Sequence, residues 1–196
     1  MKIGIYAGVY VGDVINHNID YIGADQGVSH LLKLGIHPIK AIGDMDSIEN
    51  VSQLEGLNPS TYSSIKDDTD TALAVQYAID NGYDEIDLYG VTQGRMDHFM
   101  AVICLLEKYQ DYHITIYDQK NKIQVLKPGK HIIYKDNYHY FSVFAFHKSI
   151  ISLKDCHYPL DHYTLLRNDP LCVSNQMDKD HVMIETSESI LFFQTH

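Results

Sequence analysis

"EIDLYGVTQGRMDHFMAVICLLEKYQ", residues 85–110, contains a complete strand–turn–helix unit. It opens with a short apolar segment, passes through a turn that contains Gly90 and Gly94, and continues as the longest helical pattern in the chain. Earlier segments repeat the arrangement, because strand-like runs such as "KIGIYAG" and "IKAIGD" alternate with helical patterns such as "TDTALAVQYAIDNG". This alternation predicts a parallel sheet covered by helices.

The pattern changes after about residue 120 of the sequence. Short segments rich in β-branched and aromatic residues follow, such as "YHYFSVFAF" and "SILFFQTH", and Pro, Gly, Asp or Asn often separates them. Such segments are typical of an all-β sandwich or barrel. We therefore expect an α/β domain over residues 1–122 and a β domain over residues 123–196.

The composition excludes several classes of protein. The chain has 196 residues, of which 45% are hydrophobic, so it can bury a sizeable core, and its formal net charge of −11 argues against a nucleic-acid binder. No apolar run reaches the roughly 20 residues that a membrane helix needs. Three cysteines without a CxxC pair predict neither a disulfide framework nor a Cys-rich zinc site, and we expect a cytoplasmic protein in which Cys104 is buried.

Acidic residues gather where the predicted strands end. They follow the segments "YIGA", "KAIG", "YSSIK" and "DLYG". Because the carboxyl ends of parallel strands share one edge of a sheet, where ligands bind, we expect these residues to meet there. The set is Asp25, Asp44, Asp46, Asp67, Asp70, Arg95 and Asp97.

Crowded carboxylates repel each other unless a cation lies between them. Mg²⁺ prefers oxygen ligands and is usually held by one or two carboxylates together with substrate phosphates. Gly43 would let the backbone turn sharply, so that Asp44 and Asp46 face one crevice. Arg95 stands at a helix start, where a guanidinium and free N–H groups suit phosphate. The alternative for each acid taken singly is a turn or helix cap, such as Asp68 or Thr69 before the helix near Thr71.

The residues alone therefore predict a magnesium-dependent enzyme that acts on a phosphate ester or nucleotide. The sequence has no GxxxxGK[ST] loop and no kinase "HRD" set. A phosphohydrolase, a pyrophosphokinase for another alcohol such as a pterin, and a non-catalytic nucleotide- or vitamin-binding protein remain as alternatives. Crowded carboxylates favour the enzymes over the binding protein.

Taken together, the motifs resemble the thiamine pyrophosphokinase family. The matching segments are "GADQGVSHLLKLGIHPIKAIGDMDSI", "KDDTD", "VTQGRMDH", "YPLDHYTL" and "CVSNQ". The resemblance implies a Rossmann-like parallel-sheet domain followed by a C-terminal β-sandwich, assembled as a homodimer. It also implies Mg²⁺ as cofactor, ATP as donor and the thiamine hydroxyl as acceptor, with the β,γ-diphosphate moving as one unit to give thiamine diphosphate and AMP.

The resemblance also assigns roles to residues. The metal positions are Asp44, Asp46 and Asp70, and the catalytic positions are Asp46, Asp70, Arg95 and Asp97. The positions expected to bind ATP or thiamine are Asp25, Gln26, Asp44, Asp67, Thr69, Gln93, Arg95, Ser174 and Asn175, with the last two placed against thiamine. Gln26, Met45, Gln93 and Gln176 depart from the family pattern, but none of them removes an acid or the arginine.

Overall fold

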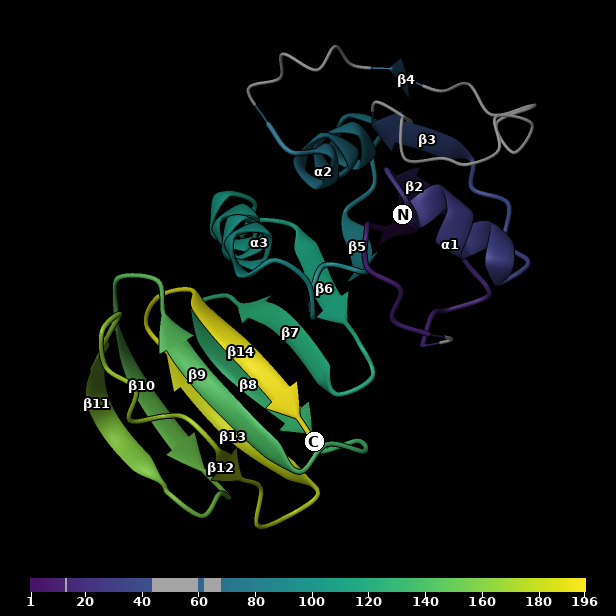
Figure 1. The fold of residues 1–196 in the computed structure, drawn as a ribbon. Helices are drawn as coiled ribbons and strands as arrows, with labels where there is room; N and C mark the ends of the chain where they lie inside the picture. The colour runs from purple at the N-terminus through teal and green to yellow at the C-terminus, as the bar shows by residue number, and fades with distance from the viewer. Residues whose placement is uncertain (13, 44–59, 62–67) are drawn as a thin grey trace. The chain divides into compact units, whose positions relative to one another are not determined.

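The computed structural model describes residues 1–12, 14–43, 60–61 and 68–196 (Figure 1). These residues form two compact units, each with its own fold. The first unit contains Met1–Lys108 and Tyr112–Gln119, and the second contains Tyr109–Asp111 and Lys120–His196. Among the residues described, there is no helix with the length and apolar character needed to cross a membrane.

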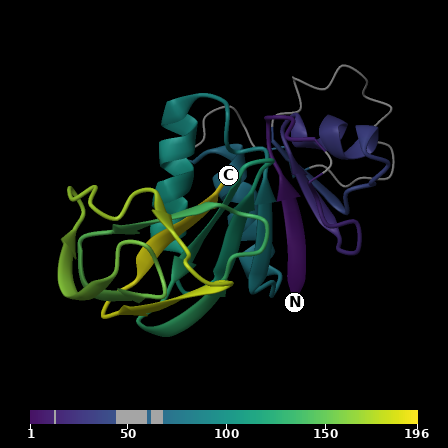
Figure 2. The same cartoon turned by 90° about the horizontal axis from the view of Figure 1, so that it is seen from below.

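The first unit is built on parallel strands in the order β6-β5-β1-β2-β3-β4. Figure 2 shows β1, in purple, running from the N-terminus into this sheet. Apart from their first residues, β1 and β5 are fully buried, as the apolar runs predict for strands covered on both faces. The strands are β1 (Lys2–Tyr6), β2 (Tyr21–Ala24), β3 (Lys40–Gly43), β4 (Ser60–Thr61), β5 (Glu85–Tyr89) and β6 (His113–Tyr117).

Three helical patterns of the sequence are confirmed as helices of this unit. They are α1 (Gly27–Lys33), α2 (Asp70–Asp80) and α3 (Met96–Lys108). Helix α2 packs on β1, β2 and β3, and it also touches α3. Thr69 caps α2, because its side-chain oxygen accepts a hydrogen bond of 3.2 Å from the backbone N–H of Ala72.

The predicted burial of Cys104 was wrong. Helix α3 buries Val102, Ile103, Leu105 and Leu106, whereas Cys104 is exposed. Residues of a helix advance around its axis by 3.6 to a turn, so a residue between two buried pairs faces outward. An apolar run read as a whole does not reveal this direction.

The second unit consists of two antiparallel sheets. One has the strand order β12-β9-β14-β7, and the other has the order β11-β10-β13-β8. The strands of the first of these sheets are β12 (Asn175–Gln176), β9 (Tyr140–Ala145), β14 (Ile190–Thr195) and β7 (Asn121–Leu126). The strands of the other are β11 (Leu160–Leu166), β10 (Lys148–Lys154), β13 (His181–Thr186) and β8 (Gly129–Tyr134).

Both sheets contribute side chains to one hydrophobic core. Phe141 on β9 and Phe192 on β14 are fully buried and stack with their ring centroids 5.8 Å apart. Leu153 on β10 and Ile184 on β13 belong to the same core. Truncating such a buried Phe to Ala costs about 3–5 kcal/mol of unfolding free energy, so this core contributes much of the stability of the second unit. The β-rich second half is thus confirmed, with its strands arranged in two sheets.

Candidate active site

The first unit has a cavity where its strand order reverses. After β1 the chain adds β2, β3 and β4 on one side, and then returns to add β5 and β6 on the other. Ligands of open parallel sheets bind outside the carboxyl ends of the strands at such a switch point. The cavity has a volume of about 260 Å³. Its lining residues follow β1, β2 and β5 or lie at or within two turns of the starts of α2 and α3: Ala7, Gly8, Val9, Asp25, Gln26, Thr69, Thr71, Gly90, Val91, Gly94, Arg95, His98 and Val102.

Four residues predicted to bind substrates line this cavity. Asp25 and Gln26 reach it from the end of β2, Thr69 from the cap of α2, and Arg95 from the start of α3. The sequence therefore located the edge of the sheet where residues distant along the chain meet.

The remaining predicted acids of this unit are placed less completely. Asp70 is the first residue of α2, and Asp97 lies in the first turn of α3. Asp44, Asp46 and Asp67 lie outside the described residues.

Close backbone contact shapes one wall of the cavity. The N–H of Val9 donates to the carbonyl of Gly90 at 3.0 Å, and the N–H of Ala7 donates to the carbonyl of Tyr89 at 2.8 Å. Gly90 has φ +73°, and a Cβ there would lie 2.6 Å from the Val9 oxygen and 2.8 Å from the Ala7 oxygen. Only glycine fits this position, because both the conformation and the space exclude a side chain.

Arg95 and Asp97 form a two-point ion pair at the start of α3. The Arg95 Nε donates to Asp97 Oδ1 at 3.1 Å, and its Nη2 donates to Oδ2 at 2.5 Å. The hydrogen bonds from Arg95 lower the pKa of Asp97 to about 2, and the backbone N–H of His98 donates a further bond at 3.0 Å. Asp97 is therefore ionised near neutral pH and is a weak base. Both side chains are largely exposed, so a phosphate can compete for the guanidinium.

The end of β3 meets two of the predicted acids. Gly43 has φ +141°, which agrees with the sharp turn expected there. A Cβ on Gly43 would lie 3.3 Å from the backbone nitrogen of Asp25 and 3.5 Å from the carboxyl carbon of Asp70. The carboxyl group of Asp70 thus lies beside the residue that directly precedes Asp44 in the chain.

The donor chemistry at this corner suits a hard cation. Asp70 brings its carboxyl group near Gly43, and Asp44 and Asp46 follow Gly43 in the sequence. Mg²⁺ favours such oxygens together with water and substrate phosphate. Within the described ranges alone, no group of three His, Cys, Asp or Glu residues is arranged to hold a metal ion.

Gln93 occupies a turn that favours glycine. It lies between β5 and α3 with φ +64°, in the left-handed region, and its side chain is exposed. Among the described residues, the set that lines the cavity contains its neighbour Gly94 but not Gln93. A glutamine in place of glycine at this position therefore strains the local backbone.

The second unit has a separate cavity of about 280 Å³. Tyr158 stands beside it with an exposed side chain, and Leu171 and Val173 are also exposed large apolar residues. Exposed apolar groups around a hollow are typical of a site for a small organic ligand. The lining residues are Leu153, Tyr158, Leu160, Leu171, Cys172, Val173 and Asn175.

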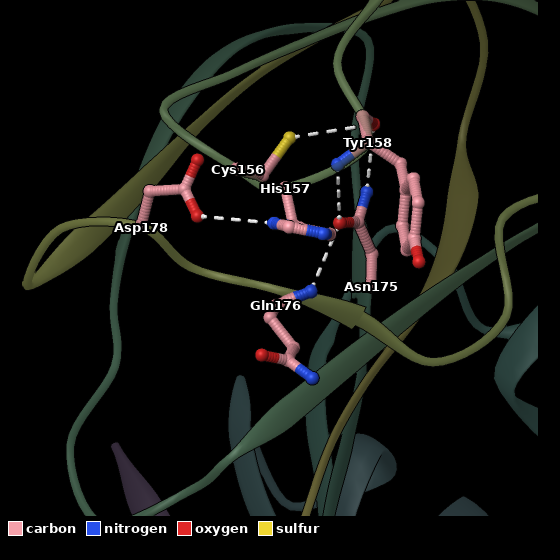
Figure 3. A network of polar contacts seen from close by, with 6 residues as sticks. All are labelled: Cys156, His157, Tyr158, Asn175, Gln176 and Asp178. Atoms are coloured by element: carbon pink, nitrogen blue, oxygen red, sulfur yellow. Dashed lines mark hydrogen bonds and ion pairs between the residues drawn. The ribbon is translucent and has the colours of Figure 1, made fainter.

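Asn175, predicted to contact thiamine, is only 3% exposed. Its Oδ1 accepts hydrogen bonds from the backbone N–H groups of Tyr158, at 3.0 Å, and Gln176, at 2.9 Å (Figure 3). Its Nδ2 donates to the carbonyl oxygen of Tyr158 at 2.9 Å. The amide group is thus bonded mainly to the protein backbone, and its direct contact with thiamine stays a prediction.

Ser174, the other residue predicted to contact thiamine, is exposed and lies at φ +60°. Its backbone N–H donates to the Ser142 hydroxyl at 3.0 Å, which fixes the turn but leaves the Ser174 side chain facing outward. A hydroxyl in this position can exchange water for a ligand without breaking the fold.

Sequence reasoning missed the cavity-lining residues without charges. Ala7–Val9 and Gly90 shape the first cavity through their backbones, and Tyr158 and Val173 line the second. The only sequence mark of the first set was a glycine after a predicted strand. The apolar residues of the second set look like any others in a β domain.

Comparison with known families assigns both units. The model of the thiamin pyrophosphokinase catalytic domain matches residues 11–117, and the model of the thiamin pyrophosphokinase vitamin B1 binding domain matches residues 130–191. The thiamine pyrophosphokinase of Bacillus subtilis is 37% identical over 166 residues, which cover 80% of this chain and 78% of the relative.

Solved structures agree with the family models. A crystal structure of thiamine pyrophosphokinase from Bacillus subtilis matches with a TM-score of 0.89 and 29% identity, and covers 100% of this chain and 99% of that one. The enzyme from Geobacillus thermodenitrificans matches with a TM-score of 0.89 and 28% identity, over 100% of this chain and 98% of that one. The Candida albicans enzyme, at 15% identity and a TM-score of 0.78, covers 100% of this chain and 89% of that one and shares the fold. With both family models matched in order along its length, the chain belongs to the thiamine pyrophosphokinase family.

Proposed function

We propose that this protein transfers the β,γ-diphosphate of ATP to the hydroxyl group of thiamine, giving thiamine diphosphate and AMP in a Mg²⁺-dependent reaction. The observation that carries the proposal is the cavity at the switch point of the first unit, with Arg95 at the start of α3. It lies within the region that matches the thiamin pyrophosphokinase catalytic domain. This unit is the Rossmann-like half of the molecule, and the two sheets of the second unit form the β-sandwich half.

ATP binds at the first cavity. The N-terminal end of α3 carries the partial positive charge of the helix dipole, and the Arg95 guanidinium provides a full positive charge beside it. Asp25, Gln26 and Thr69 contribute polar groups from other turns. Asp67 and the turn that contains Gln93 belong to this nucleotide site by family resemblance. The phosphate group needs such local positive charge because the chain as a whole is acidic.

Mg²⁺ would be held by Asp44, Asp46 and Asp70. The support for this set is the position of the Asp70 carboxyl group beside Gly43, which directly precedes Asp44. When bound, the ion neutralises charge on the phosphate oxygens. Asp70 is the first residue of α2, where the partial positive charge of the helix end also favours a carboxylate.

Arg95 stabilises the negative charge that builds on the transferred diphosphate. Its pairing with Asp97 holds the guanidinium in a defined orientation before ATP arrives. Because Arg95 keeps the pKa of Asp97 at about 2, Asp97 acts by orienting Arg95 and not by accepting the thiamine proton. The transition state of phosphoryl transfer is loose, which makes a strong base less necessary, and Asp70 is the candidate for that role.

Thiamine binds at the cavity of the second unit. The support is the match of residues 130–191 to the vitamin B1 binding domain and the exposed apolar groups around the cavity. Ser174 offers an exposed hydroxyl beside Val173 and Asn175. The three cysteines are unpaired, which suits a cytoplasmic enzyme.

The enzyme is a homodimer in which the outer face of the sheet β11-β10-β13-β8 meets a second copy. Ile132 pairs directly with Met183 on this sheet, and both side chains are exposed on its outer face. Tyr134, Ile150 and Leu166 are exposed on the same face. An apolar patch of this kind is typical of a subunit interface. Sedimentation of the double variant Ile132→Lys/Met183→Lys as a monomer supports this interface, and an unchanged dimer contradicts it.

The test of the activity is an analysis of nucleotide products after incubation with ATP, Mg²⁺ and thiamine. We expect AMP and thiamine diphosphate in equal amounts, and no AMP when thiamine is omitted. ADP with thiamine monophosphate would mean transfer of a single phosphate. AMP or ADP released without thiamine would identify a phosphohydrolase, and both results would contradict the proposal.

A further inference from the structure

Tyr158 is a large exposed residue in a segment that several hydrogen bonds hold in place. It is 62% exposed at the edge of the second cavity, although proteins usually bury most of such a residue. The segment Asp155–Tyr158 runs antiparallel beside Asn175–Asp178. The N–H of His157 donates to the Gln176 carbonyl at 2.9 Å, and the N–H of Asp178 donates to the Asp155 carbonyl at 3.1 Å.

The Asn175 side chain completes this pairing at Tyr158. It bonds both the N–H and the C=O of Tyr158, at 3.0 Å and 2.9 Å, much as a neighbouring strand would. In Figure 3 the amide group of Asn175 points at the Tyr158 backbone, while the side chain of Gln176 extends away from the network. The Cys156 thiol, whose pKa burial raises, donates to the same Tyr158 carbonyl at 3.5 Å.

These contacts use most of the hydrogen-bonding capacity of the amide. Oδ1 accepts two bonds, and Nδ2 donates to the Tyr158 carbonyl. A carboxamide has two donor hydrogens and two acceptor lone pairs, so three of these four positions are used within the protein. We therefore expect Asn175 to affect binding at the adjacent cavity through the segment that it holds.

We infer that Asn175 is a positioning residue, which fixes the Tyr158 backbone so that the Tyr158 ring stands ready beside the cavity for a flat heteroaromatic ligand. This inference rests on the proposed function, because it takes that ligand to be thiamine. An aromatic ring held in its bound position before the ligand arrives saves the free energy of ordering it. It also presents a large apolar face for stacking.

Kinetics on a double-mutant cycle separates positioning from direct contact. We expect Asn175→Ala to raise KM for thiamine about tenfold, which is the order of the cost of immobilising one side chain on binding, with KM for ATP unchanged. Tyr158→Ala should raise KM for thiamine by at least as much. If Asn175 acts through Tyr158, the double variant will be no worse than Tyr158→Ala alone. Multiplied effects would mean two independent contacts and would overturn the inference.

A purely structural role predicts another result. Asn175→Ala would then lower the midpoint of thermal unfolding while KM for thiamine stayed the same, which also overturns the inference. Asn175→Asp keeps the shape and the acceptor oxygen but loses the donor to the Tyr158 carbonyl. It replaces Asn175→Ala in the same measurements if the alanine variant does not fold. Asp178→Asn is the matched control, because it removes the exposed 3.8 Å ion pair with His157 and leaves the Asn175 amide bonds in place.

A reporter that needs no ligand distinguishes failure of this inference from failure of the proposed function. The chain has no tryptophan, so a Tyr158→Trp variant carries a single fluorescent indole at this position. We expect Asn175→Ala in that background to lower the fluorescence anisotropy and to increase quenching by acrylamide, with Asp178→Asn having no effect. Unchanged fluorescence would refute positioning, whereas a wild-type protein that does not consume thiamine would refute the proposed function alone.

Discussion

The two cavities are built by different means. The cavity of the first unit is walled by backbone, where Gly90 brings two turns into contact and the charged groups at the start of α3 stay exposed. The cavity of the second unit is walled by side chains, and the buried amide of Asn175 ties its turn down. An exposed, charged edge suits a highly charged nucleotide that brings its own cation. A fixed apolar hollow suits a ligand recognised by shape.

Of the variants considered, one that removes the Arg95 side chain should have the largest effect on activity. Arg95→Ala should reduce kcat by about 10²–10³-fold, because a charge aimed at the developing negative charge is lost. The unfolding midpoint should hardly change, since the Arg95–Asp97 pair is exposed. Steady-state kinetics with both substrates measures this, and Lys108→Ala at the other end of α3 is the matched control. A variant with near wild-type kcat would show that the charged edge is not where the diphosphate reacts.

A side chain at Gly90 should have the next largest effect, and it should act through the fold. Gly90→Ala should cost about 2–5 kcal/mol of unfolding free energy, combining a left-handed backbone with contacts to two carbonyl oxygens. Denaturant unfolding measures it. The adjoining Gly8 offers the control, because a Cβ there would meet nothing within 4 Å. Equal stability of Gly90→Ala and Gly8→Ala would contradict the backbone-built wall.

The pH dependence of activity tests the role of Asp97. The folded-state pKa of Asp97 is about 2, below its ordinary value of 3.8, so its pairing with Arg95 favours folding above that ordinary value and is lost as the pH falls toward about 2. Between about pH 5 and pH 9 Asp97 stays ionised and should add no inflection to the profile of kcat/KM. An acidic limb in that range that disappears in Asp97→Asn would identify it as the base.

The smallest expected effect is a gain. Gln93→Gly should raise the unfolding free energy by up to about 1 kcal/mol, because it removes a non-glycine residue from a left-handed conformation. Activity should stay close to that of the wild type, since the Gln93 side chain is exposed and its neighbour Gly94 lines the cavity. A loss of ATP binding would show instead that the Gln93 side chain contacts the nucleotide.

The sequence predicted the features that depend on periodicity and chain order. Helix α2 appeared where a cap, an apolar stripe and an Asn-Gly end coincide, and Asp25 and Arg95 reached one cavity because parallel strands end on a common edge. The direction in which a side chain points was harder to predict. Whether Cys104 faces outward depends on which face of α3 is covered. Whether the Asn175 amide bonds the backbone depends on Tyr158, which lies 17 residues away in the chain.

The assignment of MgATP to the first cavity and thiamine to the second is tested most directly by isothermal titration calorimetry, with each ligand titrated separately into two variants. We predict that Arg95→Ala weakens the binding of MgATP and leaves thiamine binding unchanged, and that Tyr158→Ala does the reverse. If Arg95→Ala lost thiamine while keeping MgATP, or if Tyr158→Ala lost MgATP while keeping thiamine, the assignment of the two ligands would be contradicted.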